Sequence, residues 1–211
     1  MTKINYNDID QYINENNLVG FGKEVTVYKF GEKVIKIFHE ERKTSIKRIS
    51  DDGLEKLTEI SLNCFLLPID IIYNNEKIVG YTEKFVEEKE MNFDNIDFYL
   101  IKEDIITLSN NGFSIEDLFY NYIFTSDNLY FNDLTSYSYL KTDVDFLKKQ
   151  ILNKNIIIMN NFLIGLLLFD AFRKGQNSEY TKIYLANEYR LENCSNMFYG
   201  DLLKEKKFKN K

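Results

Sequence analysis

Hydrophobic and polar positions change their period along the chain, and the first part alternates as strands do. Residues 18–38 are rich in β-branched and aromatic side chains, with a turn-forming Gly31-Glu32 between two runs. This pattern predicts three strands, at about 17–21, 24–30 and 33–38. Residues 66–86 hold two more strand-like runs around residues 74–77, whose composition is typical of a hairpin turn. We therefore expect a five-stranded antiparallel sheet within the first 86 residues.

Apolar positions at helical spacing precede and interrupt this sheet. Ile9, Tyr12 and Ile13 predict a short amphipathic helix within residues 6–16. Residues 40–62 predict one or two helical segments after the third strand, broken near Asp51-Asp52-Gly53.

The rest of the chain is predicted to be mainly helical. Its expected helices cover residues 94–110, about 143–153, 156–173 and 178–191. Residues 121–131 form an exception, because they are typical of two short strands around a turn at 125–128. After Asp133 the chain is polar to about residue 141.

Composition places the chain among globular proteins. The 211 residues are 44% hydrophobic and 28% charged, which is ordinary usage for a folded domain and excludes a disordered chain. Asn160 and Asn161 divide the most apolar run, residues 155–172, and neither half reaches the ~20 residues of a membrane span. We expect a buried core helix there. The polar first residues hold no signal peptide, so we expect a soluble, cytoplasmic protein without a membrane partner.

Charge and cysteine usage exclude two further classes. A net charge of -6 argues against a nucleic-acid partner, which needs a basic face. Only the tail, residues 204–211, is basic, and we interpret it as a solvated terminus. Cys64 and Cys194 are far apart and His39 is the single histidine, so a Cys/His zinc site is excluded. His39 ends a strand-like run, which makes it a poor base for a serine or cysteine nucleophile.

Two glycines, Gly20 and Gly22, lie in a strand-turn-strand context, whereas a dinucleotide-binding fold needs a helix directly after its glycines. Glycines let a backbone approach phosphate oxygens closely. Val25 stands where a third glycine would be, and Val27 follows two positions later. Taken alone, the pair also fits a glycine-bearing β-turn.

Lys36 follows Gly22 by 14 positions and is flanked by apolar residues on the third strand. Taken alone, it fits a lysine whose stem lies along a half-buried strand. Further on, Asn121 and Asp133 flank the expected hairpin at 121–131. An amide oxygen and a carboxylate at the two ends of one hairpin can converge on Mg²⁺ that bridges nucleotide phosphates.

In order and spacing, these features resemble the protein-kinase-like superfamily over residues 17–172. The resemblance implies an α+β, two-lobed fold: a helical extension at 1–17, an N-lobe at 18–86 with a five-stranded antiparallel sheet and one helix, and a reduced, mainly helical C-lobe at 87–211 with a basic tail. A hinge would lie at Lys84 to Glu87. The apolar helix at 156–172 would organise the C-lobe.

The resemblance also implies ATP and Mg²⁺ as cofactors and assigns roles to single residues. Gly20, Gly22 and Val27 would form the loop over the phosphates. Lys36 would hold the phosphates and pair with a helix glutamate, for which we favour Glu55 over Glu59. Asn121 and Asp133 would hold the metal.

The catalytic loop departs from the family pattern. Residues 114–121 resemble H-R-D-L-x-x-x-N, with Ser114 and Ile115 in place of His-Arg and Glu116 in place of the aspartate. Asp117 lies one position later. D-L-T replaces D-F-G, and the A-P-E motif is missing.

Three functions remain open. The first is an ATP- and Mg²⁺-dependent phosphotransferase, with Glu116 or Asp117 as the base for a protein or small-molecule hydroxyl. The second is a pseudokinase that binds nucleotide or a partner without turnover. The third is an unrelated α+β interaction protein that binds no nucleotide.

Overall fold

The computed structural model describes residues 2–22, 24–39, 49–90, 92, 96–119, 121–133 and 137–173. The helix predicted at 178–191, the basic tail and Cys194 lie outside these residues.

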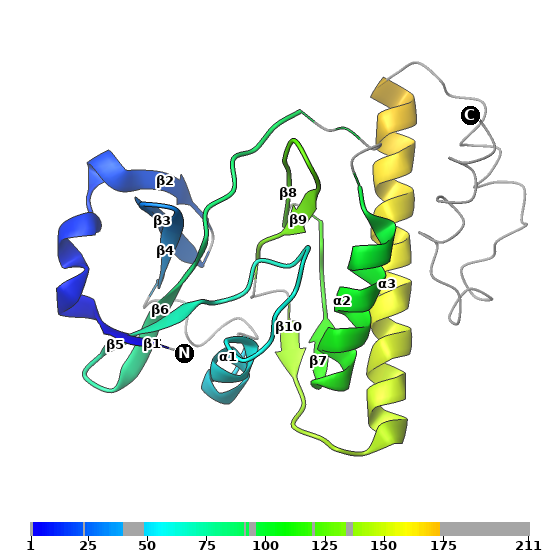
Figure 1. Cartoon of the computed structure of the whole chain (residues 1–211), viewed down its shortest axis with the longest axis horizontal. Coiled ribbons are helices and arrows are strands. Elements are labelled where there is room, and N and C mark those ends of the chain that lie inside the picture. Colours follow the sequence, from blue (N-terminus) through cyan, green and yellow to red (C-terminus); the bar gives the residue numbers. More distant parts are fainter. Residues whose placement is uncertain are drawn as a thin grey trace, which may run out of the picture.

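A six-stranded sheet occupies the N-terminal part (Figure 1), with the strand order β1-β5-β6-β4-β3-β2. Its strands are β1 (Thr2–Asn5), β2 (Leu18–Phe21), β3 (Val25–Phe30), β4 (Lys33–Phe38), β5 (Asp70–Asn74) and β6 (Lys77–Lys84). The five predicted strands are present and antiparallel. The sheet is nevertheless mixed, because β1 adds a sixth strand parallel to β5. The expectation of a purely antiparallel, five-stranded sheet was therefore wrong at one edge.

The amphipathic helix predicted for residues 6–16 is replaced by three single-turn 3₁₀ segments, Tyr6–Asp8, Asp10–Tyr12 and Glu15–Asn17. The side chains of Asn5 and Asn14 accept hydrogen bonds from backbone N–H groups just after them. Such local bonds compete with an α-helix. Ile9 is still buried, since it packs on Ile35 and Ile72 on one face of the sheet.

Helix α1 (Asp51–Leu57) follows the third antiparallel strand, as predicted. A break was predicted near Asp51-Asp52-Gly53; residues 49–50 are not helical and α1 begins at Asp51, while residues 40–48 lie outside the described residues. The Ser50 side chain accepts a hydrogen bond from the Gly53 N–H at 3.1 Å, and the two aspartates lie in the first turn, where the helix dipole favours negative charge.

In the described residues of the C-terminal part, two helices lie side by side (Figure 1), α2 (Phe98–Asn110) and α3 (Asp145–Arg173). Helix α3 is continuous, whereas two helices were predicted. The predicted gap between residues 153 and 156 includes Asn155. The Asn155 side chain is buried and bonds to Ser109, Phe113 and Ile115, so it belongs to the core.

Two small sheets complete this part of the chain. The hairpin β8 (Tyr122–Phe124) and β9 (Leu129–Phe131) was predicted. The antiparallel pair β7 (Phe113–Ile115) and β10 (Tyr137–Tyr139) was not, because 21 residues separate its two strands in the sequence.

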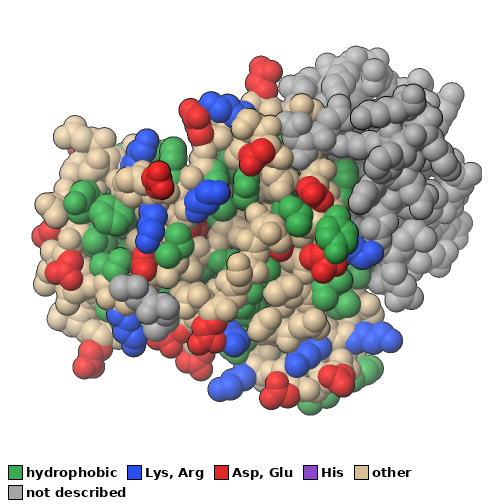
Figure 2. All heavy atoms as spheres, in the orientation of Figure 1, with side chains coloured by type: hydrophobic (Ala, Val, Ile, Leu, Met, Phe, Trp, Pro, Cys, Tyr) green, Lys and Arg blue, Asp and Glu red, His purple; other side chains and the backbone are tan. Residues whose placement is uncertain are grey.

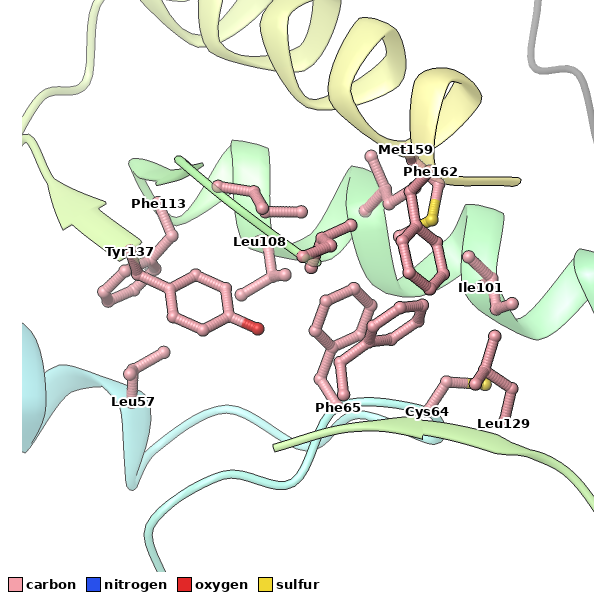
Figure 3. Close-up of a cluster of buried hydrophobic side chains, with 14 of the residues drawn as sticks. Leu57, Cys64, Phe65, Ile101, Leu108, Phe113, Leu129, Tyr137, Met159 and Phe162 are labelled. Carbon is pink, nitrogen blue, oxygen red and sulfur yellow. The ribbon is translucent and has the colours of Figure 1, made fainter. Parts of the chain in front are cut away.

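One hydrophobic core joins the two parts (Figure 3). It combines Leu57, Cys64 and Phe65 with side chains of α2, α3 and the small strands. The Phe131 ring lies 4.7 Å from that of Phe65 and 5.4 Å from that of Phe162, centroid to centroid. Phe131 thus fixes the β8–β9 hairpin between the N-terminal part and α3. No helix among the described residues is both long and apolar enough to cross a membrane.

Candidate functional site

The register of the sheet aligns the predicted glycine loop with Lys36. Gly20 lies opposite Val27, Val27 opposite Lys36, and Lys36 opposite Tyr81. Residues that face each other across neighbouring strands project to the same side of a sheet. The Gly22 N–H donates to the Val25 carbonyl at 2.8 Å, which closes the tip of the β2–β3 loop. Gly20, Val27 and Lys36 therefore form one row across the sheet.

The ammonium group of Lys36 is buried and has partners in both parts of the molecule. Its Nζ lies 2.7 Å from Glu83 Oε1 and donates to the backbone carbonyl of Asn132. It also lies 5.7 Å from the centroid of the Tyr81 ring. An ammonium carries three N–H donors, and two of them have oxygen partners among the described residues, which leaves the third for a ligand.

Glu83 and Lys36 lie on the neighbouring strands β6 and β4, in diagonal positions. Lys36 faces Tyr81, and Glu83 lies two positions further along β6, opposite Val34. This diagonal distance suits two long side chains. Glu83 is 2% exposed, and its Oε2 has no hydrogen-bond partner in the described structure. Burial raises the pKa of Glu83 to about 7, with a contribution from the charge of Asp133, and outweighs the opposing effect of Lys36.

Glu55, the predicted partner of Lys36, bonds elsewhere. Its Oε1 accepts a hydrogen bond of 2.6 Å from the Tyr73 hydroxyl. The ion pair that the family resemblance assigned to Glu55 is formed by Glu83.

The ends of the β8–β9 hairpin meet beside Lys36. The Asn132 N–H donates to the Asn121 carbonyl at 3.2 Å, so Asn121 is adjacent to the segment that contains Asp133. Both Asn121 and Asp133 are half-buried. Besides burial, the charges of Asp133 and Glu83 raise the pKa of Tyr137. Lys36, Glu83, Asp133 and Tyr137 therefore belong to one electrostatic neighbourhood.

The two candidate bases, Glu116 and Asp117, follow strand β7. Glu116 Oε1 accepts from the Ser138 hydroxyl at 2.8 Å and forms an ion pair of 2.6 Å with Lys154 of α3. The exposed Asp117 accepts from the Phe119 N–H at 2.9 Å. The same turn continues to Asn121, whose N–H donates to the Leu118 carbonyl at 3.2 Å. Glu116 is thus tied to β10 and α3, whereas Asp117 belongs to the turn that leads to Asn121.

The donor set at this site fits Mg²⁺ bound together with phosphates. The described residues contain no cluster of three or more His, Cys, Asp or Glu that could hold a metal alone. Mg²⁺ bound with a nucleotide needs only one or two protein oxygens, since phosphates and water complete its octahedron. The carboxylate of Asp133 and the amide of Asn121 supply oxygens of the right kind.

Comparison with solved structures finds chains whose fold is similar to that of this protein. No protein-family model matches the chain, and no curated protein matches it. The structure is similar to that of the Legionella pneumophila Lpg2603 kinase bound to IP6, with 20% sequence identity and a TM-score of 0.41. The match covers 67% of this chain and 56% of that kinase, so the chain spans little more than half its length.

Sequence reasoning did not identify Glu83 as a site residue. The signal was present, because strand alternation places Glu83 on the same face as the apolar Val79 and Tyr81. Figure 2 shows acidic and basic side chains intermixed over the viewed face of the described residues.

Proposed function

We propose that the protein is an ATP- and Mg²⁺-dependent phosphotransferase of kinase-like type. The observation that carries the proposal is the contact between Lys36 and the Asn132 carbonyl, which brings a buried cation to the hairpin end where Asn121 and Asp133 lie. A cation and two oxygen ligands at one place are the groups that bind a nucleotide triphosphate with its metal.

In this proposal Lys36 binds phosphate oxygens with its remaining donor, and Gly20 and Gly22 let the β2–β3 loop approach the phosphates. Asn121 and Asp133 would hold Mg²⁺, which neutralises charge as the phosphoryl group moves. Phosphoryl transfer depends mainly on such positioning and charge stabilisation. The predicted hinge, Lys84 to Glu87, would contact the adenine of ATP.

Of the two carboxylates, Asp117 is the better candidate for the base. Glu116 Oε1 both accepts the hydrogen bond from Ser138 and forms the ion pair with Lys154, which neutralises the charge of the carboxylate. Asp117 is exposed and lies in the turn that leads to Asn121, a proposed metal ligand. A base must lie within hydrogen-bond reach of the acceptor hydroxyl, so proximity to the metal site favours Asp117. The acceptor would be a protein or small-molecule hydroxyl.

A pseudokinase is the second candidate. It is favoured by the ion pair between Glu116 and Lys154, because Glu116 occupies the position that aligns with the family's catalytic aspartate. In that case the site would bind nucleotide without turnover.

A thermal-shift titration with ATP, with and without Mg²⁺, tests the nucleotide site. A ligand that binds only the folded state raises the melting temperature by mass action. We expect a Mg²⁺-dependent rise for the wild type that is lost in Asp133→Asn. Absence of any shift with ATP would overturn both the transferase and the nucleotide-binding pseudokinase, leaving an interaction protein.

A further inference from the structure

We infer that Glu83 on β6, and not a glutamate of helix α1, is the positioning residue that holds Lys36 for the phosphates. This inference rests on the proposed nucleotide site and adds a residue to it. Its structural basis is the 2.7 Å ion pair between Lys36 Nζ and Glu83 Oε1, with both side chains almost fully buried.

The geometry of the pair favours a role in orientation. Lys36 and Glu83 belong to two neighbouring strands of one sheet, β4 and β6, so backbone hydrogen bonds fix the distance between their Cα atoms. Glu83 therefore holds the ammonium from the sheet side, while the Asn132 carbonyl holds it from the hairpin side. The direction of the remaining N–H donor is thereby set.

The pair is also poorly explained as a purely structural device. A buried ion pair is often no more stable than apolar side chains of the same size. Here Glu83 Oε2 has no hydrogen-bond partner in the described structure, which adds a desolvation cost. A costly, incompletely bonded carboxylate beside a candidate phosphate ligand is easier to explain by function.

In this arrangement helix α1 does not position Lys36. Glu55 bonds to the Tyr73 hydroxyl on β5, and its helix is anchored by the Ser50 cap. A lysine positioned from within the sheet keeps its orientation when α1 moves. We therefore do not expect movement of α1 to change how Lys36 is positioned, as it would if α1 carried the glutamate that pairs with the lysine.

The test compares MgATP with adenosine as ligands, by isothermal titration calorimetry on the full chain. Adenosine lacks phosphates, so Lys36 does not contribute to its binding. We expect Glu83→Gln to weaken MgATP about tenfold or more, the usual effect of removing one charged partner, and to leave adenosine affinity unchanged. Glu55→Gln is the matched control and is expected to change neither affinity.

A double variant separates positioning from a general effect on the fold. If Glu83 acts through Lys36, then Lys36→Met/Glu83→Gln binds MgATP as weakly as Lys36→Met alone. If Glu83→Gln does not fold, Glu83→Asp keeps the charge but withdraws it by one methylene, and the same loss confined to MgATP is expected.

The outcomes are distinct. If the wild type does not bind MgATP, the proposed function is wrong. If the wild type binds MgATP and the folded Glu83 variants bind it equally well, the inference is wrong while the proposed function stands. The same holds if these variants lose affinity for adenosine as much as for MgATP. A loss in Glu55→Gln that exceeds the loss in Glu83→Gln would return the positioning role to α1.

Discussion

The side-chain oxygen of Asn155, on α3, accepts a hydrogen bond of 2.7 Å from the Ile115 N–H at the end of β7. The Asn155 amide nitrogen donates to the Phe113 carbonyl and to the Ser109 hydroxyl, each at 2.9 Å. One fully buried amide thus fixes the strand that leads to Glu116 and Asp117 against both C-terminal helices.

We expect Asn155→Ala to lower the free energy of unfolding by roughly 2–4 kcal/mol, because it leaves buried backbone groups of β7 unsatisfied and opens a cavity. Denaturant unfolding measures this loss. The neighbouring Lys154→Ala is the control: it removes only the half-exposed pair with Glu116, worth about 0–1 kcal/mol. Equal losses in both variants would contradict the role of Asn155.

The raised pKa of Glu83 gives the protein a pH-dependent stability. Its folded-state pKa of about 7 exceeds the ordinary 4.5, so the folded chain binds this proton more tightly than the unfolded chain does. The resulting stability is complete below 4.5 and is lost as the pH rises through about 7. We expect the melting temperature of the wild type to fall relative to that of Glu83→Gln between about pH 5 and pH 8. Parallel melting curves across this range would show that Glu83 does not titrate there.

Two glycines of the sheet are predicted to respond differently to alanine. A Cβ on Gly80 would lie 2.2 Å from the Lys36 carbonyl oxygen, so Gly80→Ala forces β4 and β6 apart and costs roughly 1–3 kcal/mol. A Cβ on Gly20 would meet only Val27, at 3.9 Å. We expect Gly20→Ala to keep its stability within about 0.5–1 kcal/mol and yet to bind MgATP more weakly, because the loop can no longer approach the phosphates. Thermal melts and calorimetry measure the two effects. Unchanged MgATP affinity in Gly20→Ala would argue against a phosphate loop.

Turnover distinguishes the two candidate bases and the pseudokinase. We expect Asp117→Asn to lower the rate of ATP turnover, measured as ADP release, by about 10²–10⁴-fold, and Glu116→Gln to have a much smaller effect. Asn at position 117 keeps an oxygen that can accept from the Phe119 N–H, so its local turn is preserved. The opposite order of effects would assign the base to Glu116. A wild type that binds MgATP without releasing ADP would be a pseudokinase.

The sequence predicted those elements whose signals are local. The β5–β6 hairpin turns at Asn75 and Glu76, which both have positive φ, of 47° and 67°, as a two-residue turn of the I′ kind requires. Helix α2 ends at Asn110, the predicted last residue, two positions before Gly112 with its φ of 84°. Turn residues and period were sufficient in both cases.

Features that depend on distant pairing were missed. Strand β1 pairs with β5 across more than 60 residues, and no short-range pattern specifies that register. The break predicted before residue 156 is absent: α3 continues through Asn155, which is polar and buried. Lys36 forms its ion pair with Glu83 instead of Glu55 because of the register between β4 and β6, which only the folded sheet defines.

The parallel strand β1 has a practical consequence for shortened forms of the protein. It covers the edge of β5, and the residues that follow it bring Ile9 onto the sheet face formed by Ile35 and Ile72. A chain that began at residue 18 would present an unpaired strand edge beside a bare apolar face, the combination that templates edge-to-edge association between molecules. The first seventeen residues are therefore part of the folding unit, and their removal is expected to yield aggregates instead of a smaller domain.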